Sequence, residues 1–92
     1  AAKGGIISLT RSLAREFAPT IRENAVAPGP TSTPMLAAEA AIPGHSESTE
    51  DIPMGRYAEP MEIANSIVFL ASEQAGYFCG DVLSPNGGAV MR

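Results

Sequence analysis

The chain has 92 residues, 45% of them hydrophobic, which fits at most one small globular domain and argues against disorder. Ten acidic and six basic residues give a net charge of −4, and the basic residues are scattered, so the composition argues against nucleic-acid binding. The chain has no window of 18 apolar residues and a single cysteine, Cys79, so we predict a cytoplasmic protein without a membrane span, an internal disulfide or a metal site.

The first segment is predicted to be an amphipathic helix over residues 3–18. Its larger apolar side chains recur at steps of three, four and four residues, which places them on one helix face. They are Ile6, Leu9, Leu13 and Phe17. Arg11 and Arg15 lie one turn apart and are expected to face water. Pro19 is expected to end the helix because its ring cannot continue the turn.

A strand is predicted next, over residues 21–27, closed by the breaker Pro28-Gly29-Pro30. Thr33 and Pro34 then suit the N-cap and first position of a short helix, which stops before Pro43. Residues 43–59 are the least regular part of the chain. They include a polar, acidic run at 46–51 that we interpret as a solvated loop, followed by a turn at 52–56.

A second long helix is predicted to begin at Pro60 and to end around residues 72–74. Pro60 suits the first helical position, and the carboxylate of Glu62 complements the positive end of the helix dipole. Ile63, Ile67 and Leu70 are predicted to form its buried stripe. A short strand at 80–84 and a turn at 85–88 follow.

The predicted order of elements is helix, strand, short helix, loop, helix, strand. Two strands separated by a long helical connection favour parallel pairing with a right-handed crossover, and therefore an α/β fold. Parallel sheets need neighbours on both edges and covered faces, so we expect the strand at 21–27 to have a further neighbour upstream of Ala1.

Several segments together resemble one known family in their order and spacing. They include Ala2-Lys3-Gly4-Gly5, Asn24-Ala25-Val26-Ala27-Pro28-Gly29-Pro30, Ile52-Pro53-Met54-Gly55-Arg56 and Asn86-Gly87-Gly88, with further matches at 12–19, 59–64, 67–72 and 80–83. With these segments the chain resembles the C-terminal portion of a classical short-chain dehydrogenase/reductase. The resemblance covers nearly the whole chain.

The resemblance implies the C-terminal part of a Rossmann-type doubly wound parallel sheet. Residues 1–92 would form a partial NAD(P)-binding domain whose N-terminal cofactor-binding half is absent. The implied activity is hydride transfer that interconverts a small-molecule alcohol and a ketone with NAD or NADP. A homo-oligomer is implied as well.

The family also implies site residues. Lys3 matches the lysine of a Tyr-x-x-x-Lys pair, which holds the nicotinamide ribose hydroxyls and lowers the pKa of the tyrosine. Pro28 and Gly29 match the loop after the sixth strand. Thr31 matches a position whose backbone contacts the nicotinamide carboxamide, and Thr33 matches a threonine whose hydroxyl reaches the cofactor amide or pyrophosphate. The tyrosine, the catalytic serine and the Gly-rich loop are expected upstream of Ala1.

Each of these assignments has a simpler alternative. Lys3 is otherwise a solvated side chain, and Thr31 and Thr33 are otherwise turn and capping residues. Glu23 departs from the family pattern, because Val is usual at this position in a buried strand, and an unpaired buried carboxylate is costly. The alternative function is a non-catalytic remnant that acts only by association with a full-length homologue.

Overall fold

The computed structural model describes residues 2–34 and 49–91. Its elements, in chain order, are helix α1 (Ala2–Phe17), strand β1 (Ala25–Val26), helix α3 (Pro60–Ala71), 3₁₀ helix η1 (Glu73–Ala75) and strand β2 (Val82–Leu83). The predicted short helix after Pro34 and residues 46–48 of the acidic run lie outside the described residues. Both long helices begin and end close to the predicted positions.

The two strands pair in parallel, as predicted, with Ala25 opposite Val82 and Val26 opposite Leu83. Each strand is only two residues long, so the predicted bounds of 21–27 and 80–84 are too wide. Hydrogen bonds nevertheless continue the pairing on both sides. Ahead of the strands, the N–H of Gly80 donates to the carbonyl of Glu23 at 2.7 Å, and beyond them the N–H of Gly29 donates to that of Pro85 at 3.1 Å.

The strand at 21–27 is shortened at its start by two polar side chains. Arg22 and Asn24 donate to backbone carbonyls between residues 72 and 78, and Asn24 also accepts the N–H of Asp81 at 3.0 Å. Glu23 therefore lies ahead of β1 and is half-buried, not inside a fully buried strand as its position in the sequence predicts. Because the N–H of Asp81 bonds to the Asn24 side chain, and Gly80 bonds to the carbonyl of Glu23, the regular strand pairing ends here.

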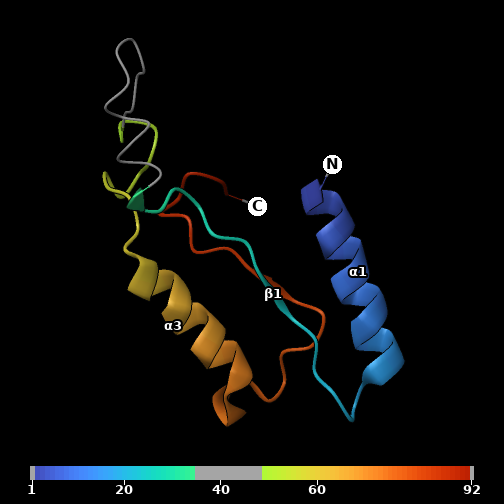
Figure 1. Ribbon diagram of the computed structural model, residues 1–92. Helices are drawn as coiled ribbons and strands as arrows, with labels where there is room; N and C mark the ends of the chain where they lie inside the picture. Colours follow the sequence, from blue (N-terminus) through green and yellow to red (C-terminus); the bar gives the residue numbers. More distant parts are fainter. Residues whose placement is uncertain (1, 35–48, 92) are drawn as a thin grey trace.

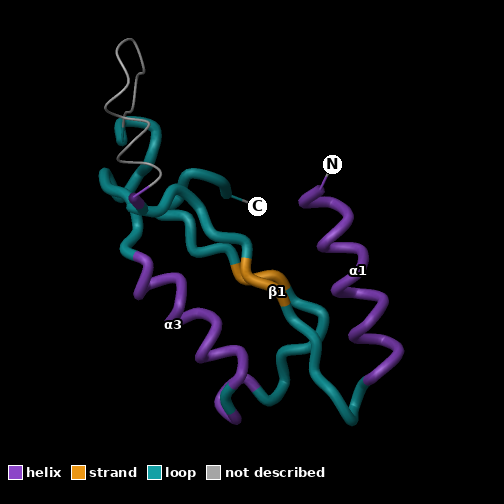
Figure 2. Tube along the Cα trace, viewed as in Figure 1, coloured by secondary structure: helices purple, strands orange, loops and turns teal. Residues whose placement is uncertain are grey.

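The two long helices lie on opposite sides of the strand pair (Figure 1), and Figure 2 shows the pair between them. Both helices contact β1. The amino ends of α1 and α3 lie at the same end of the molecule as the carboxyl end of β1. This is the layered arrangement expected of an α/β fold in which helices return antiparallel to the strands.

Small residues of α1 make its contact with the strands. Thr10 and Ala14 are buried, whereas Ile6, Leu9 and Phe17 are exposed. An ideal Cβ on Gly80 would lie 3.2 Å from the Cβ of Ala14, so the chain entering β2 approaches the helix closely. Of the apolar stripe that the sequence places on one face of this helix, only Leu13 is half-buried, and the other three side chains are exposed.

The buried stripe predicted on α3 is only partly correct. Leu70 is buried and Ile63 is half-buried, but Ile67 is 55% exposed. Ile67 and Val26 line an open hollow beside β1, so within the part of the chain that is described more than half of Ile67 stays exposed. Packing continues at the end of the helix, where Phe69 and Phe78 meet edge to face with ring centroids 5.4 Å apart.

Within residues 2–34 and 49–91, none of the helices is both long enough and apolar enough to cross a membrane.

Candidate functional site

The loop that follows β1 is held in place from two sides. On one side, Gly29 donates its N–H to the carbonyl of Pro85 in the segment after β2. On the other, the N–H of Ser32 donates to Ala58 at 2.8 Å, and the N–H of Ala58 donates to Pro30 at 3.0 Å. The loop therefore has a defined shape at the carboxyl end of a parallel strand, where open α/β sheets bind their ligands.

Pro28, Gly29, Thr31 and Thr33 all lie in this loop. The hydroxyl of Thr31 donates to the carbonyl of Gly29 at 2.9 Å, so this side chain shapes the turn. Thr33 is exposed and directly precedes Pro34. The turn chemistry considered as the alternative for Thr31 is thus present, and it is compatible with a ligand contact made by the Thr31 backbone.

Gly29 lies directly against the turn that follows β2. An ideal Cβ on Gly29 would lie 2.6 Å from the Cβ of Asn86 and 2.7 Å from its Cα, closer than a side chain tolerates. Only glycine fits at this position without a shift of one backbone. The loop after β1 and the turn after β2 are therefore placed by contact with each other.

Lys3 lies in the first turn of α1, and its side chain is outside what the structure describes. The amino end of α1 lies at the same end of the molecule as the carboxyl end of β1 (Figure 1). The fold thus brings the helix start that contains Lys3 and the loop at 28–33 to one end of the strand pair.

An ion pair that was not predicted from the sequence lies beside the loop at 28–33. Arg56 donates to both carboxylate oxygens of Glu62, at 2.7 and 3.0 Å. Glu62 also accepts the N–H of Glu59 at 2.9 Å, which closes the first turn of α3. The hydrogen bonds from Arg56, followed by the one from Glu59, lower the pKa of Glu62 to about 2. The same ion pair raises the pKa of Arg56.

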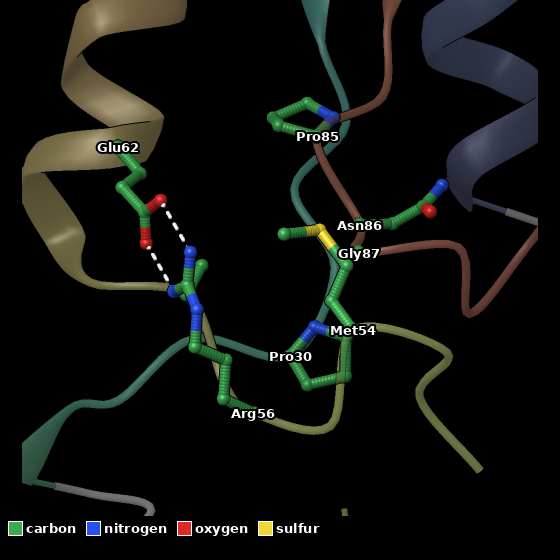
Figure 3. A pocket seen from close by; sticks show the side chains of 8 residues that line it. Pro30, Met54, Arg56, Glu62, Pro85, Asn86 and Gly87 are labelled. Atoms are coloured by element: carbon green, nitrogen blue, oxygen red, sulfur yellow. Dashed lines mark hydrogen bonds and ion pairs between the residues drawn. The ribbon is translucent and has the colours of Figure 1, made fainter.

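A cavity of about 180 Å³ lies between this ion pair and the turn after β2. Figure 3 shows Arg56 and Glu62 on one side, Pro85, Asn86 and Gly87 on the other, and the side chain of Met54 pointing into the space between them. Among the described residues that line it, the predicted loop residues Pro28, Gly29, Thr31 and Thr33 are absent. The cavity is therefore a neighbour of the predicted site and not the site itself.

The described residues contain no group of three His, Cys, Asp or Glu side chains that could hold a metal ion. Cys79 is a free, exposed thiol whose Sγ lies 4.0 Å from the carbonyl oxygen of Ala14. His45 lies outside the described residues.

Comparison with known proteins identifies relatives along the whole chain. Residues 1–90 match the family model described as enoyl-(acyl carrier protein) reductase. The chain is 45% identical to the glucose and ribitol dehydrogenase homolog of Oryza sativa subsp. japonica, with 100% of this chain and 31% of that protein covered. The chain spans about a third of the length of the curated relatives that it matches.

Solved structures give the same result. The structure of a short-chain dehydrogenase/reductase, described as glucose/ribitol dehydrogenase, from Brucella melitensis is 40% identical with a TM-score of 0.86, over 98% of this chain and 36% of that one. A protein from Agrobacterium tumefaciens, solved with bound NADP, is 39% identical with a TM-score of 0.88, over 99% of this chain and 38% of that one.

The layered helices, the parallel pair and the loop at the strand ends define part of an α/β fold of the Rossmann type. The match of the family model to residues 1–90, together with these relatives, shows that the chain belongs to the short-chain dehydrogenase/reductase family.

Proposed function

We propose that the chain is part of an NAD(P)-dependent oxidoreductase that interconverts an alcohol and a ketone by hydride transfer. The observation that supports this most directly is the position of the loop at 28–33. It follows the carboxyl end of a parallel strand, at the same end of the molecule as the start of the helix that contains Lys3. Open α/β sheets bind dinucleotides at this end.

The residues of the loop fit a nicotinamide cofactor in their chemistry. A carboxamide needs hydrogen-bond donors and acceptors, and the loop offers backbone groups around Thr31 and the exposed Thr33. Gly29 and Pro30 are fixed by bonds to Pro85 and Ala58, so the loop is preorganised. Preorganisation reduces the entropy cost of binding.

The bound cofactor supplies the hydride acceptor or donor for the reaction. In this proposal, the ammonium group of Lys3 binds the ribose hydroxyls and lowers the pKa of the tyrosine that acts as general acid and base. Thr31 binds the carboxamide through its backbone, and Thr33 binds the cofactor through its hydroxyl. Pro28 and Gly29 fix the course of the loop. These roles follow from the family resemblance.

The proposal includes a small-molecule alcohol or ketone substrate, a homo-oligomeric state and a cytoplasmic location. NAD and NADP are both compatible with it, and the relative from Agrobacterium tumefaciens was solved with NADP. Residues 1–92 would form part of an NAD(P)-binding domain, with further cofactor contacts made by residues upstream of Ala1.

Cofactor binding tests this function. The protein at the length that its gene encodes, called here the natural-length protein, should bind NADH or NADPH saturably in isothermal titration calorimetry. It should also oxidise the reduced cofactor in the presence of a ketone or an aldehyde. The 92-residue chain alone should show no saturable binding at micromolar concentrations, because it would lack most of the cofactor contacts. Absence of binding to the natural-length protein would refute the proposal.

A control separates cofactor binding from general loss of structure. Thr33→Val removes the hydroxyl and keeps the size and branching of the side chain, so weaker binding by a fully folded variant supports the cofactor contact. Ser66→Ala removes a hydroxyl on α3 that bonds within its own helix, so binding by that variant should be unchanged.

A further inference from the structure

We propose that Asn86 is a positioning residue for the loop at 28–33. Its side-chain amide shapes the turn after β2, and that turn fixes the position of Gly29. The inference rests on the function proposed above, because it concerns the same loop. It adds a residue to which the family resemblance assigns no role beyond a turn.

The amide of Asn86 organises this turn through three hydrogen bonds. Its Nδ2 donates to the hydroxyl of Ser84 at 2.8 Å and to the carbonyl of Val90 at 2.9 Å. Its Oδ1 accepts the N–H of Gly88 at 2.8 Å. A single half-buried side chain thus connects both ends of a segment that runs from residue 84 to residue 90.

The same turn touches two segments that are distant in sequence. On one side, Pro85 accepts the N–H of Gly29, and the Cα of Asn86 occupies the space that a Cβ on Gly29 would need. On the other side, Gly87 accepts the N–H of Met54 at 3.0 Å. The turn therefore lies between the loop after β1 and the turn at 52–56, and a shift of its backbone moves Gly29.

This turn packs closely against Ile52 and Pro53 on one side, whereas on the other side it borders open space and is held by its hydrogen bonds. The cavity of about 180 Å³ borders Pro85, Asn86 and Gly87, so on that side the turn has room to move. Figure 3 shows the side chain of Asn86 pointing away from Arg56 and Glu62. The amide thus points away from the ion pair at the cavity, and it holds the turn through bonds within the turn itself.

The experiment is a comparison of Asn86→Ala with the wild type in the natural-length protein. We expect the Kd for reduced cofactor to rise roughly five- to thirtyfold, as expected when one or two hydrogen bonds no longer support the loop. The rate constant kcat at saturating cofactor should change little, because the reacting groups are untouched. A residue with a structural role alone would lower Tm and leave the Kd of the folded protein unchanged.

Two further variants test whether a rise in Kd comes from the loss of the Asn86 hydrogen bonds. Asn86→Asp keeps acceptors for the Gly88 N–H and the Ser84 hydroxyl but places a carboxylate oxygen against the Val90 carbonyl, so it should recover only part of the affinity. Asn65→Ala, at an exposed asparagine on α3, should leave the Kd unchanged. If Asn86→Ala fails to fold, Ser84→Ala removes one of the three bonds, and a rise in Kd of roughly two- to tenfold is expected.

The outcomes separate this inference from the proposed function. A wild-type protein that binds no cofactor refutes the function and with it the role of Asn86. A wild-type protein that binds cofactor, alongside a folded Asn86→Ala variant with the same Kd, overturns the positioning role and leaves the function intact.

Discussion

Arg56 and Glu62 join the turn at 52–56 to the first turn of α3 through two nearly parallel hydrogen bonds, at 2.7 and 3.0 Å. Both side chains are substantially exposed, at 50% and 43%, so solvent screens their attraction. The ion pair therefore contributes mainly by orienting the Arg56 side chain and contributes little to the free energy of folding. It fixes the guanidinium in a two-point arrangement that a lysine does not reproduce, and it borders the cavity beside the loop at 28–33.

The carboxyl group of Glu62 should titrate well below its ordinary range, because the ion pair with Arg56 lowers its pKa from 4.5 to about 2. Since the folded-state pKa lies below the ordinary value, the stabilisation from this group is complete above pH 4.5 and is lost as the pH falls towards 2. A carbon-detected NMR titration of the side-chain carboxyl should give a midpoint near 2. In Arg56→Met the midpoint should return towards 4.5, and a midpoint near 4.5 in the unchanged protein would contradict the geometry.

Arg22 connects the start of the β1 segment to the end of the α3 region. Its guanidinium donates to the carbonyls of Ala75 at 2.8 Å and Ser72 at 3.2 Å. Arg22→Ala should lower the free energy of unfolding by about 1.5–3 kcal/mol, because these half-buried carbonyls lose a charged donor. Arg22→Lys should recover only part of this, since one ammonium cannot reach both carbonyls in the same way.

Urea unfolding of the natural-length protein measures this effect. Arg15→Ala is the matched control, because Arg15 is exposed on α1 and its loss should change the free energy by about 0.5 kcal/mol or less. Equal effects of Arg22→Ala and Arg15→Ala would show that the bonds from Arg22 do not hold the fold.

Gly29→Ala should be destabilising because its new methyl group meets the backbone of Asn86. The predicted contacts of 2.6 and 2.7 Å require one of the two segments to move. We expect a loss of about 1–3 kcal/mol in the free energy of unfolding. At Gly5, in contrast, a Cβ meets nothing within 4 Å, and Gly5→Ala in the helix should stabilise by about 0.5–1 kcal/mol. Chemical denaturation of the two variants should therefore give opposite signs, and a neutral Gly29→Ala would refute the contact.

The isolated 92-residue chain should associate in solution. Its exposed large side chains include Ile6, Leu9, Ile67 and Val68, and the described residues pair β1 on one edge only. Exposed apolar helix faces and unpaired strand edges both favour association. Light scattering coupled to size exclusion should give a mass that rises with concentration, and the double variant Ile6→Glu, Leu9→Glu should reduce it. A monomer at every concentration would exclude this expectation.

The sequence predicted the course of the chain well where local signals are strong. Pro19 and Pro60 mark helix ends through backbone chemistry that does not depend on the rest of the fold, and both positions are close to the observed bounds. The parallel pairing followed from the long connection between two short strands, and it is confirmed. The family assignment, made from motifs in order, is confirmed as well.

The sequence was less informative where neighbours decide the outcome. Ile67 has the correct spacing for a buried stripe, but burial requires a partner surface, and the space beside β1 is open. The strands were predicted too long because, ahead of β1, the N–H of Asp81 bonds to the side chain of Asn24 instead of to a backbone carbonyl. The contact between Gly29 and Asn86 joins residues far apart in the chain, so no local pattern indicates it.

The roles of Lys3, Thr31 and Thr33 remain predictions from the family resemblance. The structure places Thr31 and Thr33 in the loop after β1 and Lys3 in the first turn of α1. Cofactor titrations of the Lys3→Met and Thr33→Val variants test the proposed roles of these two side chains.

The proposed hydride transfer with Lys3 in the site is tested by the steady-state rate of the natural-length protein with Lys3→Met, measured with reduced cofactor and a ketone. We expect kcat/KM to fall by about 10²- to 10⁴-fold in a variant that still folds, with Lys3→Arg retaining more activity because it keeps the positive charge. A folded Lys3→Met enzyme with the rate of the wild type would refute the proposed role of Lys3 in proton transfer.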